Sequence, residues 1–454
     1  SGVSRIEKIN DESGNEQVKY NDLTAEEWLA TLENGDYGGY EFRIATSRQY
    51  RFTPEEEMSG MVNPAIEKRN NLVNAKYNIV LREAYYEESE LQAAISNSAL
   101  AGTQFSDLVS VTMPTMANLA SSGFIINLFS VPFFNAEASY LNGETVKNSV
   151  VNDYMYAIYD QATFYQEDFW CVFYNENLLR DGADSEIIKA VKEGKWTWDM
   201  LMRYAEEAAS EVMEKRSPDF YTDTFGIGSF TDKNKFATAA FTSSGLSLFG
   251  DTFHKSLTYT MDSDAGNQAA DIIRGIINSK SYIGLSGEEA SKAFLEGRTA
   301  FFIYRVNYAK TVAETRLSWN LAPLPKMTEE QSKYFSYVGT TSAGLSVPAH
   351  QHDSARTGKV LNAILAASYI NIDDAIKTNY ITFCLRDNDA AITLSTIFRN
   401  PVMDIGTIYA EGYDRLSFLT NETILKAVKS DISFAYMYIN NASALAALNE
   451  NEFR

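Results

Sequence analysis

The sequence has few of the residues from which metal centres, disulfide frameworks and nucleophilic catalytic sites are built. Its two cysteines, Cys171 and Cys384, provide no disulfide framework and no zinc-site spacing. Its three histidines, His254, His350 and His352, are scattered along the chain, which disfavours a histidine-based catalytic centre. We therefore expect no metal ion, no cofactor and a buried thiol at Cys171, which lies in an apolar run.

Long apolar runs and excess positive charge are also missing. The nearest candidate for a membrane span, residues 124–134, is interrupted by Asn127, Ser130 and Pro132. The net charge is -21, from 60 acidic and 39 basic residues, and it disfavours binding to nucleic acid or to an anionic membrane surface. Aromatic residues are abundant instead, at 13%. Large cores account for most of them, and the remainder suits stacking on sugar rings.

A length of 454 residues predicts two α/β lobes. Residues 1–23 are polar and aperiodic and are expected to be a disordered tether. Thr24 and Glu27 form a capping box for a short helix to about residue 32. Three strand-and-helix alternations follow and predict a mostly parallel sheet. The expected strands are 42–45, 79–84 and 108–111, and the expected helices are 60–78, 87–101 and 115–122.

The carboxyl ends of these strands carry planar and hydrogen-bonding side chains. Ligands of such sheets bind beyond those ends. No glycine-rich phosphate loop follows any of the three strands, so a dinucleotide site is disfavoured. The side chains present there instead are Arg48 and Gln49, Tyr85 and Tyr86, and Ser110 and Thr112.

The stretch 168–179 organises the middle of the chain. Residues 169–174 are uncharged and rich in aromatic and β-branched residues, which predicts a buried strand, and Thr197 is the expected N-cap of a helix over 198–213. Strand alternation places Asp168 and Trp170 on one face, at the expected junction of the lobes. Asp168 suits acceptance of hydrogen bonds from sugar hydroxyls, and Trp170 suits stacking.

The later part of the chain continues the α/β pattern. Residues 286–289 form a second expected capping box, which opens a helix to residue 296. Strands are expected at 299–304, ending in Arg305, and at 319–323. Residues 337–347 are extended and suit a second crossing between the lobes, and the chain is expected to be mostly helical from residue 353 onward.

Several short runs carry a resemblance to a known family. They are Tyr174-Asn-Glu-Asn-Leu-Leu179, Trp196-Thr-Trp-Asp199, Phe294-Leu-Glu-Gly-Arg-Thr-Ala-Phe301, Ala322-Pro-Leu-Pro-Lys326 and the run from Gly339 to Pro348. In their order and spacing these runs resemble the family 1 extracellular solute-binding proteins, the substrate receptors of ABC importers and the class of the maltose-binding protein. Two further runs, 385–389 and 403–409, resemble a subgroup common in Gram-positive bacteria. The resemblance extends from about residue 40 to the C-terminus.

The resemblance implies a two-lobe α/β fold of the periplasmic-binding-protein type II class with a helix-rich C-terminus. The chain would cross three times between the lobes, which would hold a ligand by hinge closure. After a leader and short helix over 1–35, lobe 1 would comprise 36–167 and 343–388. Lobe 2 would comprise 168–342 and 389–454.

The resemblance also implies where ligand-binding residues lie. Many similar sugar receptors carry a tryptophan shortly after the turn at Gly297, where this chain has Asn307 and Tyr308. Trp170 or Tyr308 is the expected substitute. The full set of expected ligand-binding residues is Arg48, Gln49, Tyr85, Tyr86, Ser110, Thr112, Asp168, Trp170, Tyr304, Arg305, Asn307 and Tyr308.

The function implied is capture of a carbohydrate, expected to be an oligosaccharide, and its delivery to an ABC permease in the membrane. We expect a monomer that is not an enzyme and that works outside the cytoplasm, as a Gram-positive cell-surface lipoprotein or in a periplasm. The abrupt start at Ser1-Gly2 is consistent with removal of an export signal or lipid anchor before position 1, on which the sequence itself is silent. Two alternatives stay open: a glycoside hydrolase, for which paired acids are not evident, and a non-transporting sensor on the same scaffold.

Overall fold

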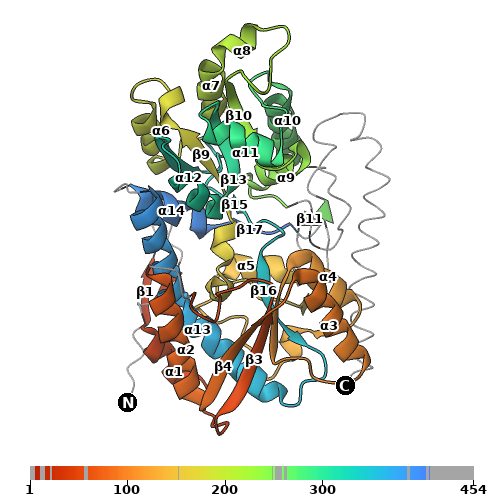
Figure 1. Cartoon of the computed structure of the whole chain (residues 1–454). Helices are drawn as coiled ribbons and strands as arrows, with labels where there is room; N and C mark the ends of the chain where they lie inside the picture. Colours follow the sequence, from red (N-terminus) through yellow and green to blue (C-terminus); the bar gives the residue numbers. More distant parts are fainter. Residues whose placement is uncertain are drawn as a thin grey trace.

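Two separate β-sheets lie one above the other, each at the centre of an α/β lobe (Figure 1). The computed structural model describes residues 6–10, 16–20, 23–55, 60–151, 153–247, 249–250, 258–259, 263–385, 389–404 and 408. We call the body that contains β3 and β4 the lower lobe and the body that contains β9 and β13 the upper lobe, as they stand in Figure 1.

The lower lobe contains a five-stranded sheet in the order β4-β3-β5-β16-β6. The first three of these strands are parallel, and β16 joins the sheet antiparallel to β5 although it comes more than two hundred residues later. The three predicted alternations are therefore confirmed, with ends shifted by one or two residues. The elements are β3 (Tyr40–Thr46), α2 (Val62–Tyr77), β4 (Ile79–Tyr85), α3 (Glu88–Leu100), β5 (Leu108–Thr112), α4 (Met113–Ser121), β6 (Ile125–Ile126) and β16 (Ala343–Pro348).

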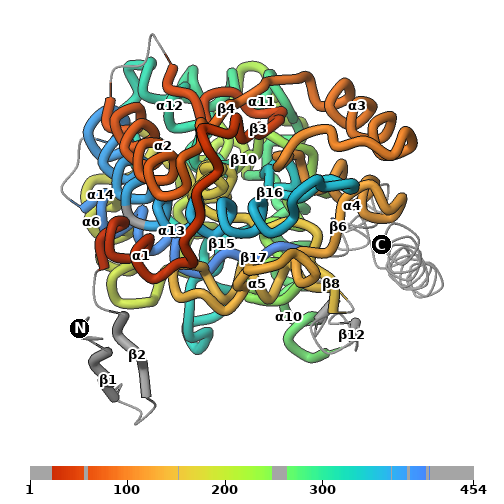
Figure 2. The backbone as a smooth tube through the Cα atoms, turned by 90° about the horizontal axis from the view of Figure 1, so that it is seen from below, coloured from red at the N-terminus to blue at the C-terminus, as the bar shows by residue number. Residues whose placement is uncertain are grey.

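Two further helices cover this sheet. Helix α1 (Ala25–Thr31) begins at the predicted capping box: the Thr24 hydroxyl accepts from the Glu27 amide at 3.2 Å, and the Glu27 carboxylate accepts from the Thr24 amide at 2.8 Å. Helix α13 (Ser354–Asn379) is the longest of the described helices and contacts both α1 and α2. Figure 2 shows α1, α2 and α13 gathered on one side of the lobe.

The upper lobe contains a four-stranded sheet in the order β10-β13-β9-β14. Strand β9 (Trp170–Asn175) lies inside it, antiparallel to both neighbours, and all six of its residues are buried. The predicted apolar strand and the Thr197 N-cap, which accepts from the Met200 amide, are confirmed. The other elements are α6 (Ala183–Lys192), α7 (Trp198–Ala208), α8 (Ser210–Glu214), β10 (Phe225–Ser229), α9 (Lys233–Thr242), α10 (Asp264–Asn278), α11 (Gly287–Leu295), β13 (Thr299–Arg305), α12 (Ala309–Ala313), β14 (Trp319–Pro323) and α14 (Ala390–Arg399).

The chain passes between the two bodies at three places (Figure 1). The first passage follows the 3-10 turn η3 (Tyr165–Asp168), the second lies between β15 (Ser336–Tyr337) and β16, and the third is the π-helical turn η7 (Tyr380–Leu385) before α14. Strand β15 pairs in parallel with β17 (Pro401–Val402). Short elements fill the remaining connections: η1 (Leu128–Ser130), α5 (Gly143–Ser149), β7 (Val150–Val151), β8 (Tyr154–Met155), η2 (Gln161–Thr163), η4 (Glu176–Leu178), β11 (Phe249–Gly250), β12 (Thr258–Tyr259) and η6 (Val306–Tyr308).

The structure differs from the sequence-based expectations in four places. The leader is not wholly irregular, because β1 (Ile6–Asn10) and β2 (Glu16–Tyr20) form an antiparallel hairpin. The helix over 198–213 is interrupted at Ala209, where φ is -99° and ψ is 22°. The second capping box does not form, since Ser286 makes no side-chain cap bond and the following Gly287 has a φ of +60°. The C-terminal part includes the strand β17, and residues 409–454 lie outside the described ones.

None of the helices in the described ranges combines the length and the apolar character that a bilayer crossing requires.

Asp160 is a buried acidic residue of the lower lobe. This residue is 3% exposed, and its Oδ1 accepts from the Ala162 amide at 2.6 Å, whereas Oδ2 has no hydrogen-bond partner among the described residues. Arg69, which is fully buried, donates to the carbonyl oxygen of Arg51 at 2.7 Å. Burial raises the pKa of Asp160 to about 7, although the Ala162 amide and Arg69 act in the opposite direction. The carboxyl group is therefore protonated in the folded protein under mildly acidic conditions.

This pKa predicts that the contribution of Asp160 to stability falls as pH rises from about 4 to about 7. In that range the folded chain retains a proton on Asp160 that the unfolded chain has lost, so folding is favoured at the lower pH. The shift from 3.8 to about 7 sets an upper bound of about 4 kcal/mol for this contribution. Urea unfolding across the range should show a smaller loss in Asp160→Asn, which keeps the acceptor Oδ1. The exposed Asp271→Asn should behave as wild type, and an unchanged slope in Asp160→Asn would contradict the assignment.

A close approach of backbone in the upper lobe predicts a severe effect of Gly226→Ala. A Cβ at Gly226, in β10, would lie 2.1 Å from the carbonyl oxygen of Ala205 in α7, and backbone cannot move aside as a side chain can. We expect a loss of about 3 kcal/mol or more in the free energy of unfolding. Gly275→Ala in α10 is the matched control, because nothing lies within 4 Å of its Cβ position. Helix propensity should make that variant more stable by up to about 1 kcal/mol, as thermal unfolding can measure.

Candidate ligand-binding site between the lobes

Four polar residues from separate parts of the chain meet where the lobes join. Asp168, at the end of η3, accepts from Nη1 of Arg305 at 3.0 Å and from the Thr341 hydroxyl at 3.2 Å. Arg48, in the loop after β3, donates to the carbonyl oxygen of Thr341 at 2.6 Å. We call these four residues the Asp168 cluster. The cluster joins the first passage, the second passage, the upper lobe through β13 and the lower lobe through the loop after β3.

The ion pair in this cluster is partly open to solvent. The side chains of Arg305 and Asp168 are 26% and 15% exposed. Burial lowers the pKa of Arg305, but Asp168 and Tyr304 raise it by more, so the guanidinium is held in its charged form. A guanidinium has five N–H donors and a carboxylate has two oxygens that each accept more than one hydrogen bond, so both groups can bind further hydroxyl groups. The pair therefore offers charge-assisted hydrogen bonds to a guest molecule.

Aromatic rings surround this ion pair. Tyr304 is half-buried and stacked on Phe230, with ring centroids 4.4 Å apart and an interplanar angle of 13°. Trp170 is only 4% exposed and lies edge-to-face with Tyr304 and Tyr337, and Tyr308 is 7% exposed with its hydroxyl 2.6 Å from Ser291. Trp170 and Tyr308, which the sequence offered as stacking partners, therefore present no open face here because their rings belong to the core. Tyr304 is the more accessible ring.

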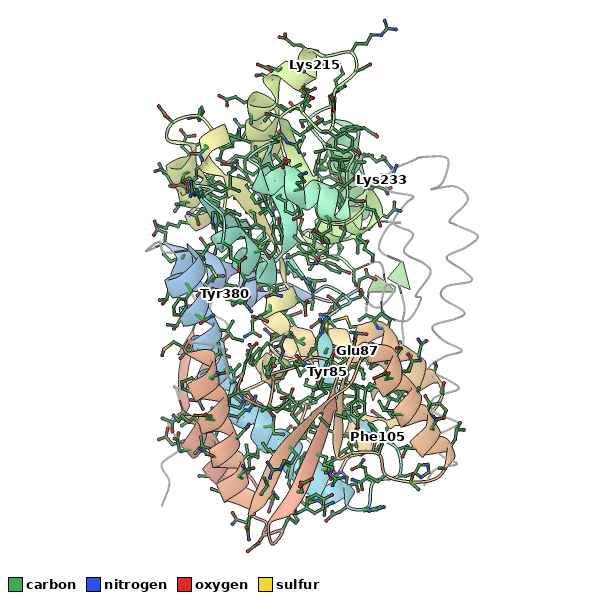
Figure 3. All side chains as sticks on the ribbon, in the orientation of Figure 1. Tyr85, Glu87, Phe105, Lys215, Lys233 and Tyr380 are labelled. Atoms are coloured by element: carbon green, nitrogen blue, oxygen red, sulfur yellow. The ribbon has the colours of Figure 1, made fainter. Side chains whose placement is uncertain are left out.

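A second cluster of polar residues lies beside the first passage. Glu167 accepts from Nζ of Lys310 at 2.7 Å, from the Tyr380 hydroxyl at 3.0 Å and from Nη2 of Arg51 at 3.5 Å. Burial alone would raise the pKa of Glu167, but Lys310, Arg51 and the hydrogen bonds outweigh it, and the pKa lies below its ordinary value. We call these four residues the Glu167 cluster. It ties η3 to the lower lobe, to α12 and to the third passage, where Figure 3 shows Tyr380.

A cavity of about 150 Å³ adjoins the Glu167 cluster. Its walls come from both lobes, and the Oδ1 atom of Asn307, one of the predicted site residues, is buried there without a hydrogen-bond partner among the described residues. A cavity of about this size holds one benzene-sized ring. The lining residues include Tyr50, Arg51, Val62, Glu167, Asn307, Lys310 and Tyr380.

The remaining predicted site residues lie at the end of the lower sheet, apart from these contacts. Tyr85 is exposed and donates to Glu87 at 2.6 Å, and Figure 3 shows both on the side turned toward the upper lobe. Tyr86 is half-buried with its ring 5.8 Å from that of Phe105. Gln49 is exposed.

Neither of the two predicted hydroxyl residues on β5 has a hydroxyl group that is both exposed and unbonded. Thr112 donates to Glu88 at 2.7 Å, and Ser110 is fully buried. The structure thus brings Arg48, Asp168, Tyr304 and Arg305 together, and it places Ser110 inside the sheet.

Sequence reasoning missed Thr341, Glu167, Lys310 and Tyr380. Thr341 lies within the extended run that was expected to be the second passage, and Glu167 directly precedes Asp168. The sequence therefore contained a weak indication that these two residues belong to the site. Nothing in the sequence pointed to Lys310 or Tyr380, because only the tertiary structure brings them next to η3. Within the described ranges, no group of three or more histidine, cysteine or acidic residues is arranged to hold a metal ion.

Comparison with solved structures identifies the fold. The structure superimposes on the maltose/maltodextrin-binding domain MalE from Bdellovibrio bacteriovorus bound to maltotriose with a TM-score of 0.51 and 13% identity, over 90% of this chain and 100% of that one. It also matches the GacH receptor of Streptomyces glaucescens, solved unliganded and with acarbose, with a TM-score of 0.50 and 15% identity, over 93% of this chain and 98% of that one. No protein-family model and no curated protein matches the chain. The chain has the two-lobe α/β periplasmic-binding-protein fold, as the sequence predicted.

The Glu167 cluster predicts that Glu167→Gln destabilises the protein. The substitution keeps the shape but removes the negative charge, which leaves Lys310 and Arg51 facing a neutral amide, and we expect a loss of about 2 kcal/mol in the free energy of unfolding. Because the pKa of Glu167 is lowered on folding, this contribution should be present above the ordinary glutamate pKa and be lost as pH falls through the folded value. Urea unfolding at neutral and acidic pH measures both effects.

The control for this substitution is Glu186→Gln on the surface of α6. Glu186 also pairs with an arginine, Arg180, but in an exposed position, so the variant should retain nearly all of the stability. Equal effects of the two substitutions would contradict a special role for the buried cluster.

Proposed function

We propose that this protein is an extracytoplasmic receptor that captures a carbohydrate between its two lobes and delivers it to an ABC permease. The observation that carries the proposal is the Asp168 cluster, an ion pair of Asp168 and Arg305 at a point where both lobes and two passages of the chain meet. The two neighbours described above were solved with saccharide ligands, maltotriose and acarbose, which supports the same class of ligand for this chain.

The chemistry of the cluster suits a sugar. Asp168 accepts and Arg305 donates within 3.0 Å of each other, so adjacent hydroxyl groups of one ring can bind both at once. Tyr304 places an aromatic ring beside the pair, against which the C–H face of a sugar can pack. We propose Arg48, Asp168, Tyr304 and Arg305 as the centre of the site and Gln49, Tyr85, Tyr86, Thr112 and Asn307 as its periphery.

Capture would proceed by closure of the lobes about the three passages. The lobe boundaries that we propose are 36–167 with 343–388, and 168–342 with 389–454. A ligand that touches both lobes binds the closed arrangement better than the open one and shifts the population toward it. We propose that the receptor acts as a monomer outside the cytoplasm, either lipid-anchored at a Gram-positive cell surface or in a periplasm, and that it turns over no substrate.

The proposal predicts that a saccharide raises the melting temperature and that Asp168→Asn weakens this effect. Binding to the folded state alone stabilises it by mass action. The substitution removes a charged acceptor while preserving shape, so the affinity should fall by about tenfold to a hundredfold. A thermal-shift screen with mono- and oligosaccharides, followed by titration calorimetry on the best ligand, measures both.

Asp199→Asn serves as the control, because its carboxylate lies on the exposed surface of α7 and should leave the affinity unchanged. Stabilisation by peptides or amines and by no saccharide would overturn the ligand class. Release of shorter saccharides during incubation would instead favour the glycoside hydrolase, since a receptor returns its ligand intact.

A further inference from the structure

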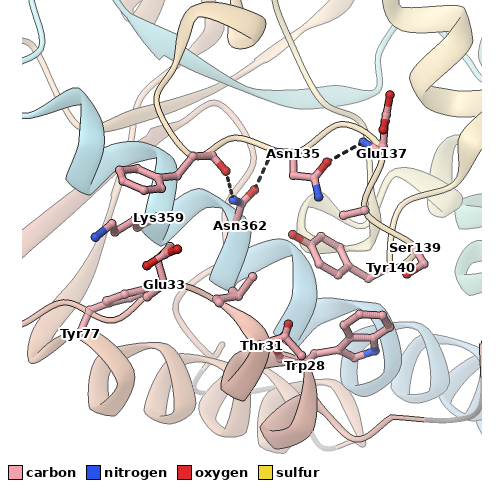
Figure 4. Close-up of a pocket in the computed structure, with 13 residues that line it drawn as sticks. Trp28, Thr31, Glu33, Tyr77, Asn135, Glu137, Ser139, Tyr140, Lys359 and Asn362 are labelled. Atoms are coloured by element: carbon pink, nitrogen blue, oxygen red, sulfur yellow. Dashed lines mark hydrogen bonds between the residues drawn. The ribbon is translucent and has the colours of Figure 1, made fainter. Parts of the chain in front are cut away.

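A second cavity lies within the lower lobe, away from the passages between the lobes. Its volume is about 300 Å³, twice that of the cavity beside Glu167. Four segments form its walls: α1 with the residues that follow it, the C-terminal end of α2 at Tyr77, the loop 133–140 and the N-terminal third of α13 (Figure 4). No member of the Asp168 or Glu167 cluster lines it.

Two buried polar groups in this wall have no hydrogen-bond partner among the described residues. Tyr140 is 2% exposed and Trp28 is 9% exposed, yet the Tyr140 hydroxyl and the Trp28 indole N–H are both without a partner. Their rings lie edge-to-face with centroids 5.5 Å apart. Figure 4 shows the Tyr140 hydroxyl directed toward the space beside Asn135 and Asn362. A buried polar group without a partner costs about 1–3 kcal/mol, so this cavity is arranged to be filled by something that forms hydrogen bonds.

The wall opposite these rings is held in place by specific contacts. The Asn362 side chain accepts from the Asn135 amide at 3.3 Å and donates to the carbonyl oxygen of Phe133, which fixes the loop to α13. Lys359 donates to the carbonyl oxygen of Asn34 at 3.0 Å, and its ammonium group lies 4.5 Å from the centre of the Phe133 ring. The cavity is therefore preformed.

The lining limits the chemistry of a guest. It combines aromatic faces with hydroxyl, amide, ammonium and carboxylate groups, so both donors and acceptors are present. Glu33 and Glu137 would repel a simple anion, and the ammonium group of Lys359, which already lies over the Phe133 ring, opposes a second cation beside that ring. A purely apolar guest would leave the Tyr140 hydroxyl unpaired. A neutral ring with several hydroxyl groups satisfies all of these conditions, because its C–H faces pack on the rings while its hydroxyls pair with the polar groups.

We propose that this cavity is a second saccharide-binding site, which accommodates one or two sugar rings independently of the site between the lobes. The inference does not rest on the proposed function of the interlobe site, because the two sites share no residue. It assigns Tyr140 and Lys359 as the polar contacts and Trp28 as part of the aromatic wall.

Fluorine NMR of the full chain labelled with 5-fluorotryptophan tests this proposal. The chain has five tryptophans, and the Trp28 resonance is identified by its loss in Trp28→Phe. Titration with glucose, galactose, mannose, N-acetylglucosamine or maltose should shift that resonance with at least one of these sugars. Tyr140→Phe, which removes only the hydroxyl, should weaken the apparent affinity about tenfold, and Lys359→Met should weaken it similarly.

Two controls separate the second site from its alternatives. Tyr221→Phe removes an exposed hydroxyl in the upper lobe and should leave the titration unchanged. Asp168→Asn should also leave the Trp28 shift unchanged; its loss in that variant would show that the signal comes from the interlobe site and would overturn the proposal. A Trp28 resonance that no sugar moves, or that moves with alanine but with no sugar, would overturn it as well.

Discussion

The arrangement of the two lobes depends on a pair of adjacent acids, Glu167 and Asp168, at the first passage of the chain. Each accepts from cationic side chains of other segments: Arg305 on Asp168, and Lys310 and Arg51 on Glu167. The two acids belong to one short 3-10 turn whose backbone leads directly into the buried strand β9. Movement of one lobe against the other therefore changes the contact of Glu167 with Arg51 and, beside Asp168, the contact of Arg48 with Thr341.

The two clusters differ in how they are built, and this difference suits two tasks. Glu167 is buried and holds three partners from α12, the third passage and the lower lobe, so it favours one arrangement of the junction. Asp168 and Arg305 are partly exposed, and Arg48 reaches the cluster through a backbone carbonyl oxygen. A ligand that pairs with these exposed groups adds interactions without disrupting the buried ones. Glu167 can therefore hold the junction in one arrangement while the neighbouring Asp168 stays accessible to a ligand.

The fold was largely predictable because its signals are local. The strand-and-helix alternation from β3 to α4, the apolar strand β9 and the caps at Thr24 and Thr197 all follow from residue types within one element. The site was only partly predictable, because a strand-end position does not reveal which way a side chain faces. Trp170 is a residue type that often stacks on sugar rings, but here the backbone at Gly339 covers its indole. A Cβ added at Gly339 would lie 3.1 Å from Nε1 of Trp170. Lys310 and Tyr380 could not be found, because their proximity to Glu167 is a product of the tertiary structure.

The two clusters at the passages carry more positive than negative groups, which is opposite in sign to the net charge of the whole chain. The protein carries a net charge of -21, yet its two clusters contain four cationic side chains, Arg48, Arg51, Arg305 and Lys310, against two carboxylates. Arg305, Lys310 and Arg51 each contact a carboxylate, whereas Arg48 contacts a carbonyl oxygen, which leaves its full charge less compensated. An acidic substituent on a sugar could therefore pair with Arg48. The acidic residues on the distant surface would oppose this little, because their charge is screened within a Debye length of about 8–10 Å. The overall acidity of the chain therefore disfavours nucleic acids more firmly than it disfavours a small ligand that carries one acidic group.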